Sequence, residues 1–175
     1  IIDFPAVYDM LAIMKGKLDA GRALLYQTAR YVDIYKALDD ISRERKLTPE
    51  ERLEQKKYAK LADSFTPLAK GMNSEYANQN AYDCIQIHGG SGFMMEYACQ
   101  RIYRDARITS IYEGTTQLQT VAAIRYVTNG SYLATIREFE TVPCSPEMDP
   151  LMSRLKKMAD LFEASTNAVK EAQDQ

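Results

Sequence analysis

One short stretch of the chain, Arg104–Gln119, contains the residue whose position best suggests chemistry. It reads RDARITSIYEGTTQLQ and sets Glu113 between Tyr112 and Gly114. A carboxylate on a connection, beside apolar side chains and a flexible glycine, can be desolvated enough to act as a general base. The alternative is an acid in the first turn of a helix, where it interacts favourably with the helix dipole.

Two polar side chains follow this acid. Thr115 and Gln117 supply a hydroxyl and an amide on the next turn, and such groups can bind a polar ligand. The alternative is that Thr115 or Thr116 caps the next helix while Gln117 faces solvent. The stretch therefore offers a base and ligand-binding groups, although ordinary helix structure also accounts for each of them.

A second segment, Gln86–Phe93, carries three glycines in the sequence QIHGGSGF. Gly89, Gly90 and Gly92 leave backbone N–H groups unshielded, which suits the close approach of a phosphate or pyrophosphate. The alternative is a turn that ends the preceding helix, since consecutive glycines adopt left-handed or extended angles. The segment is not the dinucleotide-binding fingerprint of a βαβ unit, because no strand is expected before it.

The composition excludes several classes of function. A net charge of -2 and scattered Lys and Arg residues give no basic patch for nucleic acid. No apolar run approaches the roughly 18 residues that a membrane span needs. Cys84, Cys99 and Cys144 form no CxxC pair and no disulfide framework, and His88 is the single histidine. We therefore expect a protein of a reducing compartment with no metal site.

The spacing of apolar residues predicts a first long helix from Pro5 to about Leu38. Its apolar stripe follows alternating four- and three-residue steps, and Gly21 lies on the stripe, where a missing side chain lets a neighbouring helix approach closely. The stripe consists of Val7, Leu11, Met14, Leu18, Leu25 and Val32.

The densely charged segment Ile41–Lys57 is expected to be a solvated connection that leads into a second helix. Thr48 is expected to cap this helix, Pro49 suits its first position, and Glu51 completes a capping box. Pro67 interrupts the helical pattern that follows, so we expect a kink or a short break there.

Further helices are expected over residues 94–107, over residues 115–130 with its end at Asn129-Gly130, and over residues 151–173 after a proline-rich stretch. The fold class is therefore all-α. We expect an up-and-down helical bundle over residues 1–132 with short antiparallel connections. Residues 133–175 are expected to begin a C-terminal extension, made of a linker and an additional amphipathic helix.

Together, the two segments resemble the C-terminal helical domain of the flavin-dependent acyl-CoA dehydrogenases. The family's signature is Gln, two residues, Gly-Gly, any residue, Gly and an apolar residue, followed by an acid, a basic residue and a second acid at fixed spacings. The chain supplies Gln86, Gly89, Gly90, Gly92, Phe93, Glu96, Arg101 and Asp105 in that register. RDARITSIYEGTTQLQ is similar to the family's RDA-I--IYEGT-QIQ segment. The charged connection and the proline-rich tail look more like a longer subgroup that includes methylthio-acyl-CoA dehydrogenases.

This resemblance implies a role for each site residue. Glu113 is then the base that takes a proton from the α-carbon of an acyl-CoA thioester as the β-hydride passes to FAD, giving a trans-2-enoyl-CoA. Tyr112 and Gly114 flank the substrate thioester. The residues that contact FAD are Gln86, Gly89, Gly90, Thr115 and Gln117, and of these Gln86 and Gly90 reach the FAD of a neighbouring subunit.

The resemblance also implies properties of the complete protein. The family builds its site from three domains, so this chain is expected to fold but not to catalyse alone. The complete protein is expected to be a homo-oligomer, a dimer or tetramer, that acts in fatty acid metabolism and passes electrons to an electron-transfer flavoprotein. Its expected location is the bacterial cytoplasm, or otherwise the mitochondrial matrix. The alternatives are an acyl-CoA oxidase, a relative that lost dehydrogenation, and a helical interaction module without enzymatic activity.

Overall fold

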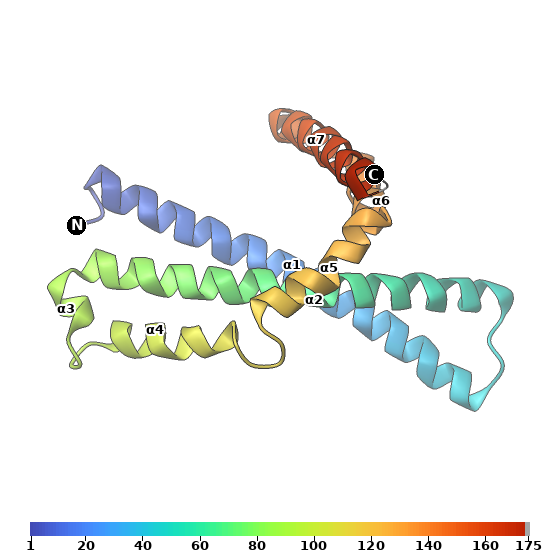
Figure 1. The fold of residues 1–175 in the computed structure, drawn as a ribbon, viewed down its shortest axis with the longest axis horizontal. Coiled ribbons are helices and arrows are strands. Elements are labelled where there is room, and N and C mark those ends of the chain that lie inside the picture. The colour runs from blue at the N-terminus through green and yellow to red at the C-terminus, as the bar shows by residue number, and fades with distance from the viewer. Residues whose placement is uncertain (174–175) are drawn as a thin grey trace. The chain divides into compact units, whose positions relative to one another are not determined.

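Helices make up most of the chain in a computed structural model that describes residues 1–173 (Figure 1). They are α1 (Pro5–Glu44), α2 (Pro49–His88), α3 (Gly90–Phe93), α4 (Ala98–Thr109), α5 (Thr116–Thr128), α6 (Ser131–Glu140) and α7 (Asp149–Gln173), with a 3-10 turn, η1, at Pro146–Met148. No strand occurs in residues 1–173, which confirms the all-α fold class. Contacts divide the chain into unit 1, which ends at Thr120, and unit 2, which begins at Val121.

The framework of unit 1 is an antiparallel pair of helices, α1 and α2 (Figure 1). Near one end of the pair, the Asn80 side-chain amide on α2 donates to the carbonyl oxygen of Met14 on α1 at 3.3 Å. Nearer its other end, the rings of Tyr31 and Phe65 meet edge to face with their centroids 5.2 Å apart. The start of α1 therefore lies beside the end of α2.

The apolar stripe of α1 is divided between this contact and the solvent. Gly21 is buried, and a Cβ there would overlap the Asn73 side chain of α2, which confirms that the missing side chain allows a close approach. Leu18 and Leu25, in contrast, are 49% and 51% exposed. The buried residues of α1 are Gly21, Thr28, Tyr31 and Leu38. The stripe is thus not one buried face, because α2 covers only the narrow seam that these four residues define.

Only residues 45–48 connect α1 to α2. The capping box is confirmed: the Thr48 backbone N–H donates to Glu51 Oε2 at 2.9 Å, and the Glu51 backbone N–H donates to Thr48 Oγ1 at 3.2 Å. Arg45 also forms an ion pair with Glu51 at 2.6 Å. Two groups, the Arg45 guanidinium and the Thr48 backbone N–H, therefore converge on the Glu51 carboxylate and hold the turn.

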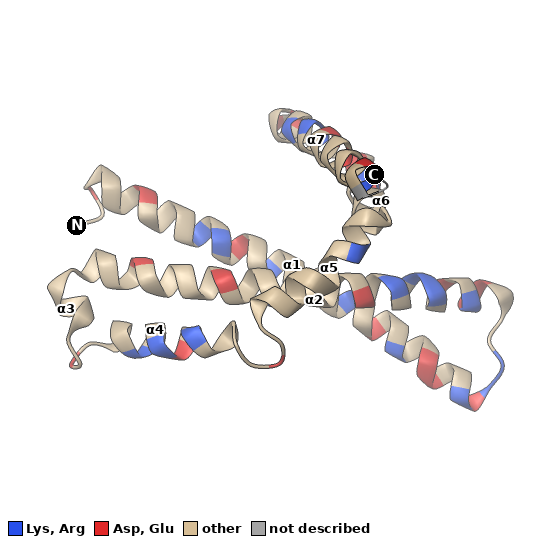
Figure 2. Cartoon of the chain, viewed as in Figure 1, with Lys and Arg blue, Asp and Glu red and all other residues tan. Residues whose placement is uncertain are grey.

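The second helix begins at Pro49 as expected, but the expected connection from Ile41 is wrong at its start, because α1 continues to Glu44 instead of ending near Leu38. Charged residues cluster on this end of the helix pair (Figure 2). Arg43 pairs with Asp39 at 2.7 Å and with Asp40 at 3.2 Å, one turn earlier in α1. Pairs at these spacings favour a solvated helix over a loop, so a high density of charge did not mark a connection here.

Pro67 lies inside α2 without ending it, and the expected short break is wrong, since α2 is continuous from Pro49 to His88. An interior proline costs about 3 kcal/mol through a lost hydrogen bond and a steric clash. Pro67 is buried, and its neighbour Phe65 packs on Tyr31 of α1. The packing of α2 along α1 outweighs this local cost.

The chain reverses direction through the glycine segment, and α4 then packs beside α2 (Figure 1). Gly89 ends α2 with a φ of 59°, which confirms the expected helix stop. Gly92 is buried: a Cβ there would lie 2.6 Å from the carbonyl oxygen of Ile85 and 2.9 Å from the Cβ of His88. A Cβ at Gly90 would meet nothing within 4 Å. Packing therefore requires a glycine at position 92 but not at position 90.

In unit 2, the linker expected from residue 133 is partly wrong, because α6 occupies Ser131–Glu140. Gly130, with a φ of 78°, separates α5 from α6, and the Asn129 side-chain oxygen accepts a hydrogen bond from the Ser131 backbone N–H at 3.0 Å. The glycine expected to close α5 thus also begins a new helix. The stretch of residues 141–145 is irregular, as its proline content predicts.

Within unit 2, α6 packs against α7. Arg137 on α6 donates to Asp160 at 2.7 Å and to Glu163 at 2.9 Å, both on α7. Hydrogen bonds to these two carboxylates raise the pKa of Arg137, so its charge persists at any accessible pH. A single guanidinium therefore orients the two helices.

The turn between α1 and α2 yields a prediction about pH. The hydrogen bond from Arg45, followed by that from the Thr48 backbone, lowers the pKa of Glu51 from 4.5 to about 2. A depressed carboxyl pKa stabilises the fold above the unfolded-state value and loses that effect as the pH falls through the folded-state value. We expect Glu51→Gln to lower the thermal midpoint at neutral pH and the difference from wild type to vanish between pH 4.5 and 2. Glu50→Gln is the matched control, and a difference that persists at pH 2 contradicts the assignment.

The glycine segment yields a prediction about packing. Gly92→Ala forces the backbone of Ile85 to move, so we expect a loss of roughly 1–3 kcal/mol in the free energy of unfolding measured with urea. Gly90→Ala is the control in the same short helix and leaves that free energy unchanged. Equal effects of the two substitutions would mean that the packing of Gly92 does not limit stability.

Candidate functional site

The loop between α4 and α5 holds Glu113 in an unusual backbone conformation. Its φ of 52° is the one positive value among the described non-glycine residues. The left-handed conformation costs a residue with a Cβ roughly 1–2 kcal/mol. Lys70 Nζ on α2 donates to the Gly114 carbonyl oxygen at 2.7 Å, and Gln119 Nε2 on α5 donates to the Glu113 carbonyl oxygen at 3.1 Å. Side chains from two helices therefore fix the backbone of this loop.

Glu113 lies at the edge of a groove in unit 1 with a volume of about 570 Å³. The groove is mainly apolar, and its walls come from α1, α2 and the loop. The lining includes Leu25, Val32, Ala69, Lys70, Tyr112 and Glu113. Lys70 also lies over the Tyr112 ring, 5.7 Å from its centroid. The groove thus combines a surface for an apolar chain with two carboxylates, those of Asp33 and Glu113, one ammonium group and one phenol.

The Glu113 side chain is itself exposed in this chain. Its neighbours Ile111 and Tyr112 are 45% and 50% exposed. The desolvation hypothesised for this carboxylate is therefore not supplied by α1, α2 or the loop. A ligand in the groove, or another protein surface over it, has to exclude the water.

A second, more polar pocket of about 450 Å³ lies beside this loop in unit 1. Its lining includes Glu75, Tyr103, Arg107, Thr115 and Gln117. The Thr115 hydroxyl accepts a hydrogen bond from the Leu118 backbone N–H at 3.4 Å, so the capping interpretation of Thr115 is confirmed. Hydroxyl, amide and guanidinium donors together suit the phosphate and polyol parts of a nucleotide cofactor.

Three residues assigned to FAD by resemblance lie elsewhere. Gln86, Gly89 and Gly90 are at the far end of α2, and all three are exposed. Lys70, which holds the Glu113 loop, and Gln86 are sixteen positions apart on this helix, or about 24 Å at 1.5 Å per residue. The structure therefore brings together Tyr112, Glu113, Gly114, Thr115 and Gln117 but not the glycine segment.

Sequence reasoning missed the residues that support this loop. Lys70 is 44 positions from the carbonyl group to which it donates, and no local pattern marks a lysine of α2 for this role. Glu75 accepts a hydrogen bond from the Thr116 hydroxyl at 2.5 Å across 41 positions. Sequence reasoning could have identified Gln119, because this residue belongs to the same motif as Glu113.

Among residues 1–173, no helix is long and apolar enough to cross a membrane. This agrees with the absence of a long apolar run in the sequence.

Two family descriptions cover the whole chain. Residues 1–127 match the family described as acyl-CoA dehydrogenase, C-terminal domain, and residues 128–175 match the one described as acyl-CoA dehydrogenase C terminal. The all-α fold and the YEGT loop agree with a C-terminal helical domain of this class. The chain belongs to the acyl-CoA dehydrogenase family, which confirms the resemblance deduced from the two segments.

Several characterised relatives are similar to most of this chain. It is 38% identical over 119 residues to the 3-methylmercaptopropionyl-CoA dehydrogenase of Ruegeria pomeroyi, which covers 68% of this chain and 18% of the relative. It is 37% identical over 123 residues to the butyryl-CoA dehydrogenase of Syntrophomonas wolfei, covering 69% and 18%. It is 35% identical over 119 residues to the caffeyl-CoA reductase-Etf complex subunit CarC of Acetobacterium woodii, covering 68% and 25%. The chain therefore spans a quarter or less of the length of these relatives.

A solved structure is also similar to this chain. A chain from a study of the electron transferring flavoprotein of Acidaminococcus fermentans and flavin-based electron bifurcation superposes with a TM-score of 0.51 at 29% identity. The match covers 73% of this chain and 27% of that one.

The contact of Lys70 with the loop is testable. We expect Lys70→Met to remove the hydrogen bond to Gly114 and to raise amide hydrogen exchange in residues 110–119 by about tenfold, since charged hydrogen bonds contribute about 1.5–3 kcal/mol. Lys60→Met, at an exposed position of the same helix, is the control. Unchanged exchange in the Lys70 variant would mean that the loop keeps its conformation without this contact.

Proposed function

We propose that this chain is the C-terminal domain of an FAD-dependent acyl-CoA dehydrogenase in which Glu113 is the catalytic base. One observation carries the proposal: a carboxylate on a side-chain-braced loop stands at the edge of an apolar groove that suits an acyl chain. The reaction converts an acyl-CoA thioester into a trans-2-enoyl-CoA. The family membership and the names of the dehydrogenase relatives support this assignment.

The chemistry requires a base beside an acidified carbon. The C–H bond next to a thioester carbonyl is a weak acid, so Glu113 takes this proton while the β-carbon gives up a hydride. FAD, when bound, accepts that hydride and is reduced. The backbone N–H of Glu113 donates to the thioester oxygen as negative charge develops there. Tyr112 and Gly114 flank the thioester, and the positive φ of Glu113 presents its N–H and its carboxylate from one loop.

The cofactor is assigned to two places on this chain. Thr115 and Gln117 hold one FAD through the polar pocket, whose hydroxyl, amide and guanidinium groups match its phosphates and ribityl chain. Gln86, Gly89 and Gly90 contact the FAD of a neighbouring copy. Their exposure, and the length of about 24 Å along α2 between Gln86 and Lys70, which contacts the loop, support a second site and therefore a homo-oligomer, a dimer or tetramer.

An electron-transfer flavoprotein is the proposed electron acceptor. The relative from Acetobacterium woodii is named as a subunit of an Etf complex, and the structural match comes from work on an electron transferring flavoprotein. The proposed location is the bacterial cytoplasm, or otherwise the mitochondrial matrix, and the proposed setting is fatty acid metabolism.

The opposite direction of the same reaction is a second candidate. Two relatives are named as reductases, the caffeyl-CoA reductase subunit and a 3-(aryl)acrylate reductase of Clostridium sporogenes that is 33% identical. Proton transfer is reversible at the same atoms, so Glu113 would then protonate the α-carbon of an enoyl thioester. The residue assignments are the same in either direction.

Anaerobic flavin bleaching tests the assignment of the base. In the FAD-loaded full-length protein, we expect acyl-CoA to bleach the flavin and Glu113→Gln to slow bleaching by about 10²–10⁴-fold, the usual contribution of general base catalysis. Glu54→Gln, at an exposed position of α2, is the control and should bleach at the wild-type rate.

Comparable bleaching rates in wild type and Glu113→Gln would refute Glu113 as the base. Peroxide release at a rate equal to turnover would identify an oxidase instead of a dehydrogenase. The chain alone, without the flavin-binding domains of its relatives, is expected to show no turnover.

A further inference from the structure

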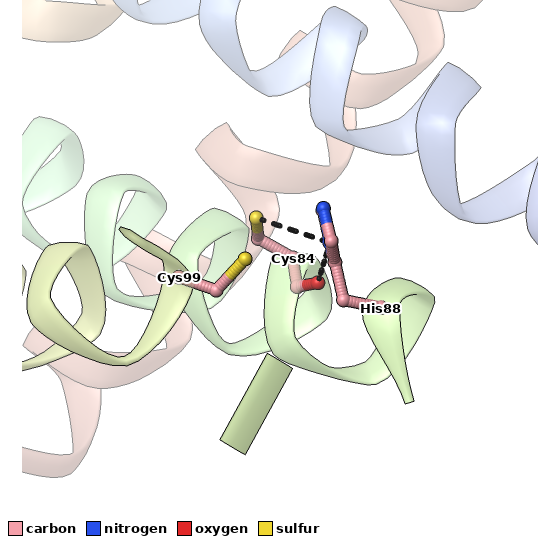
Figure 3. A group of neighbouring side chains, drawn as sticks. All are labelled: Cys84, His88 and Cys99. Carbon is pink, nitrogen blue, oxygen red and sulfur yellow. Dashed lines mark hydrogen bonds between the residues drawn. The ribbon is translucent and has the colours of Figure 1, made fainter. Parts of the chain in front are cut away.

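Three side chains that the proposed chemistry does not use lie together beside the glycine segment. Cys84 and His88 are in the last turns of α2, and Cys99 is in the first turn of α4 (Figure 3). One ligand atom from each residue, a sulfur or a ring nitrogen, lies within 4.8 Å of the other two. The positions 84, 88 and 99 follow no metal-binding motif, so the cluster exists only because α4 folds back on α2.

The local structure orients the histidine for a ligand. Positions four apart share one face of a helix, which sets His88 above Cys84. His88 Nδ1 donates to the Cys84 carbonyl oxygen at 2.8 Å, because a carbonyl group can only accept. The Nδ1 proton leaves Nε2 with a free lone pair, which is the arrangement that metal-binding histidines use.

The two thiols are close enough to interact. Burial, followed by a hydrogen bond with Cys99, raises the pKa of the Cys84 thiol. Cys99 is buried, Cys84 is partly buried and His88 is exposed. The two cysteines therefore form the more buried side of the cluster, and the imidazole forms its solvent-exposed side.

We propose that Cys84, His88 and Cys99 bind a zinc ion, with the fourth coordination position open on the solvent side. Zinc favours tetrahedral sites made of thiolate and imidazole, with bonds of about 2.3 Å to sulfur and about 2.0 Å to nitrogen. Such bonds place neighbouring ligand atoms roughly 3.5–3.8 Å apart. One ligand atom of each residue already lies within 4.8 Å of the other two, so a contraction of the side chains by about 1 Å completes the site.

Bound zinc would join the end of α2 to the start of α4 and enclose residues 89–97. This segment includes the buried Gly92 and the exposed Gly89 and Gly90. A ligand that binds only the folded state raises its stability by mass action. Zinc would thus hold the glycine segment in place from a site that shares no residue with the groove lining.

Zinc titration of the reduced chain against a chromophoric chelator tests the proposal. We expect the wild type to compete for a single equivalent of zinc and to show a higher thermal midpoint when loaded. Cys99→Ser and His88→Ala should each weaken zinc binding by about tenfold or more. Cys144→Ser removes an exposed cysteine of unit 2 and should bind zinc as the wild type does.

Cobalt provides an independent readout of the ligands. The cobalt-loaded wild type should show a sulfur-to-metal charge-transfer band that Cys84→Ser and Cys99→Ser reduce and Cys144→Ser retains. Circular dichroism of the metal-free variants establishes that each is folded. Zinc affinity unchanged in both Cys99→Ser and His88→Ala, or a charge-transfer band lost only in Cys144→Ser, would overturn the proposal.

Discussion

The packing of α2 along α1 is the constraint on which unit 1 depends. It keeps a helix of 40 residues continuous across Pro67, although an interior proline costs about 3 kcal/mol. The groups of unit 1 that matter for function are positioned by α2: Lys70 and Glu75 contact the loop that carries Glu113 or the helix start that follows it, and Cys84 and His88 lie near the end of α2. A break at Pro67 would leave the charged turn and the functional half of α2 free to move separately, so the tertiary contact sets the geometry of the site.

The loop shows how such a framework maintains local strain. The left-handed backbone of Glu113 costs roughly 1–2 kcal/mol. The carbonyl oxygens of Glu113 and Gly114 accept hydrogen bonds from the side chains of Gln119 and Lys70, respectively. Both hydrogen bonds are made to the backbone of the loop, and neither involves the Glu113 carboxylate. The loop thus positions Glu113, the proposed base, through its main chain, and these contacts leave its side chain available. This division is what proton abstraction requires.

Much of this architecture was predictable because its signals are local. The capping box at Thr48 and Glu51, the helix stop at Gly89 and the close approach at Gly21 each follow from a few neighbouring residues. The errors arose where tertiary packing or charge pairing overrode a local rule, as at Pro67 and in the charged turn. The motif identified Glu113 and its neighbours, yet Lys70 lies 44 positions from its partner. Contacts between distant positions leave no periodic trace in a single sequence.

The exposure of Glu113 and the position of the glycine segment at the end of α2 both leave the proposed site incomplete within unit 1. A groove with one open side leaves the Glu113 carboxylate in water, because desolvation needs a second wall. Leu18 and Leu25 on α1, each about half exposed, present further apolar surface that is costly to leave in water. Other domains or copies that cover these faces would bury apolar area and, by the same contact, exclude water from the carboxylate of Glu113, the proposed base. In the proposed assembly, the glycine segment of one copy contacts the cofactor of another. The contacts that stabilise the assembly by burying apolar surface then also complete the catalytic site.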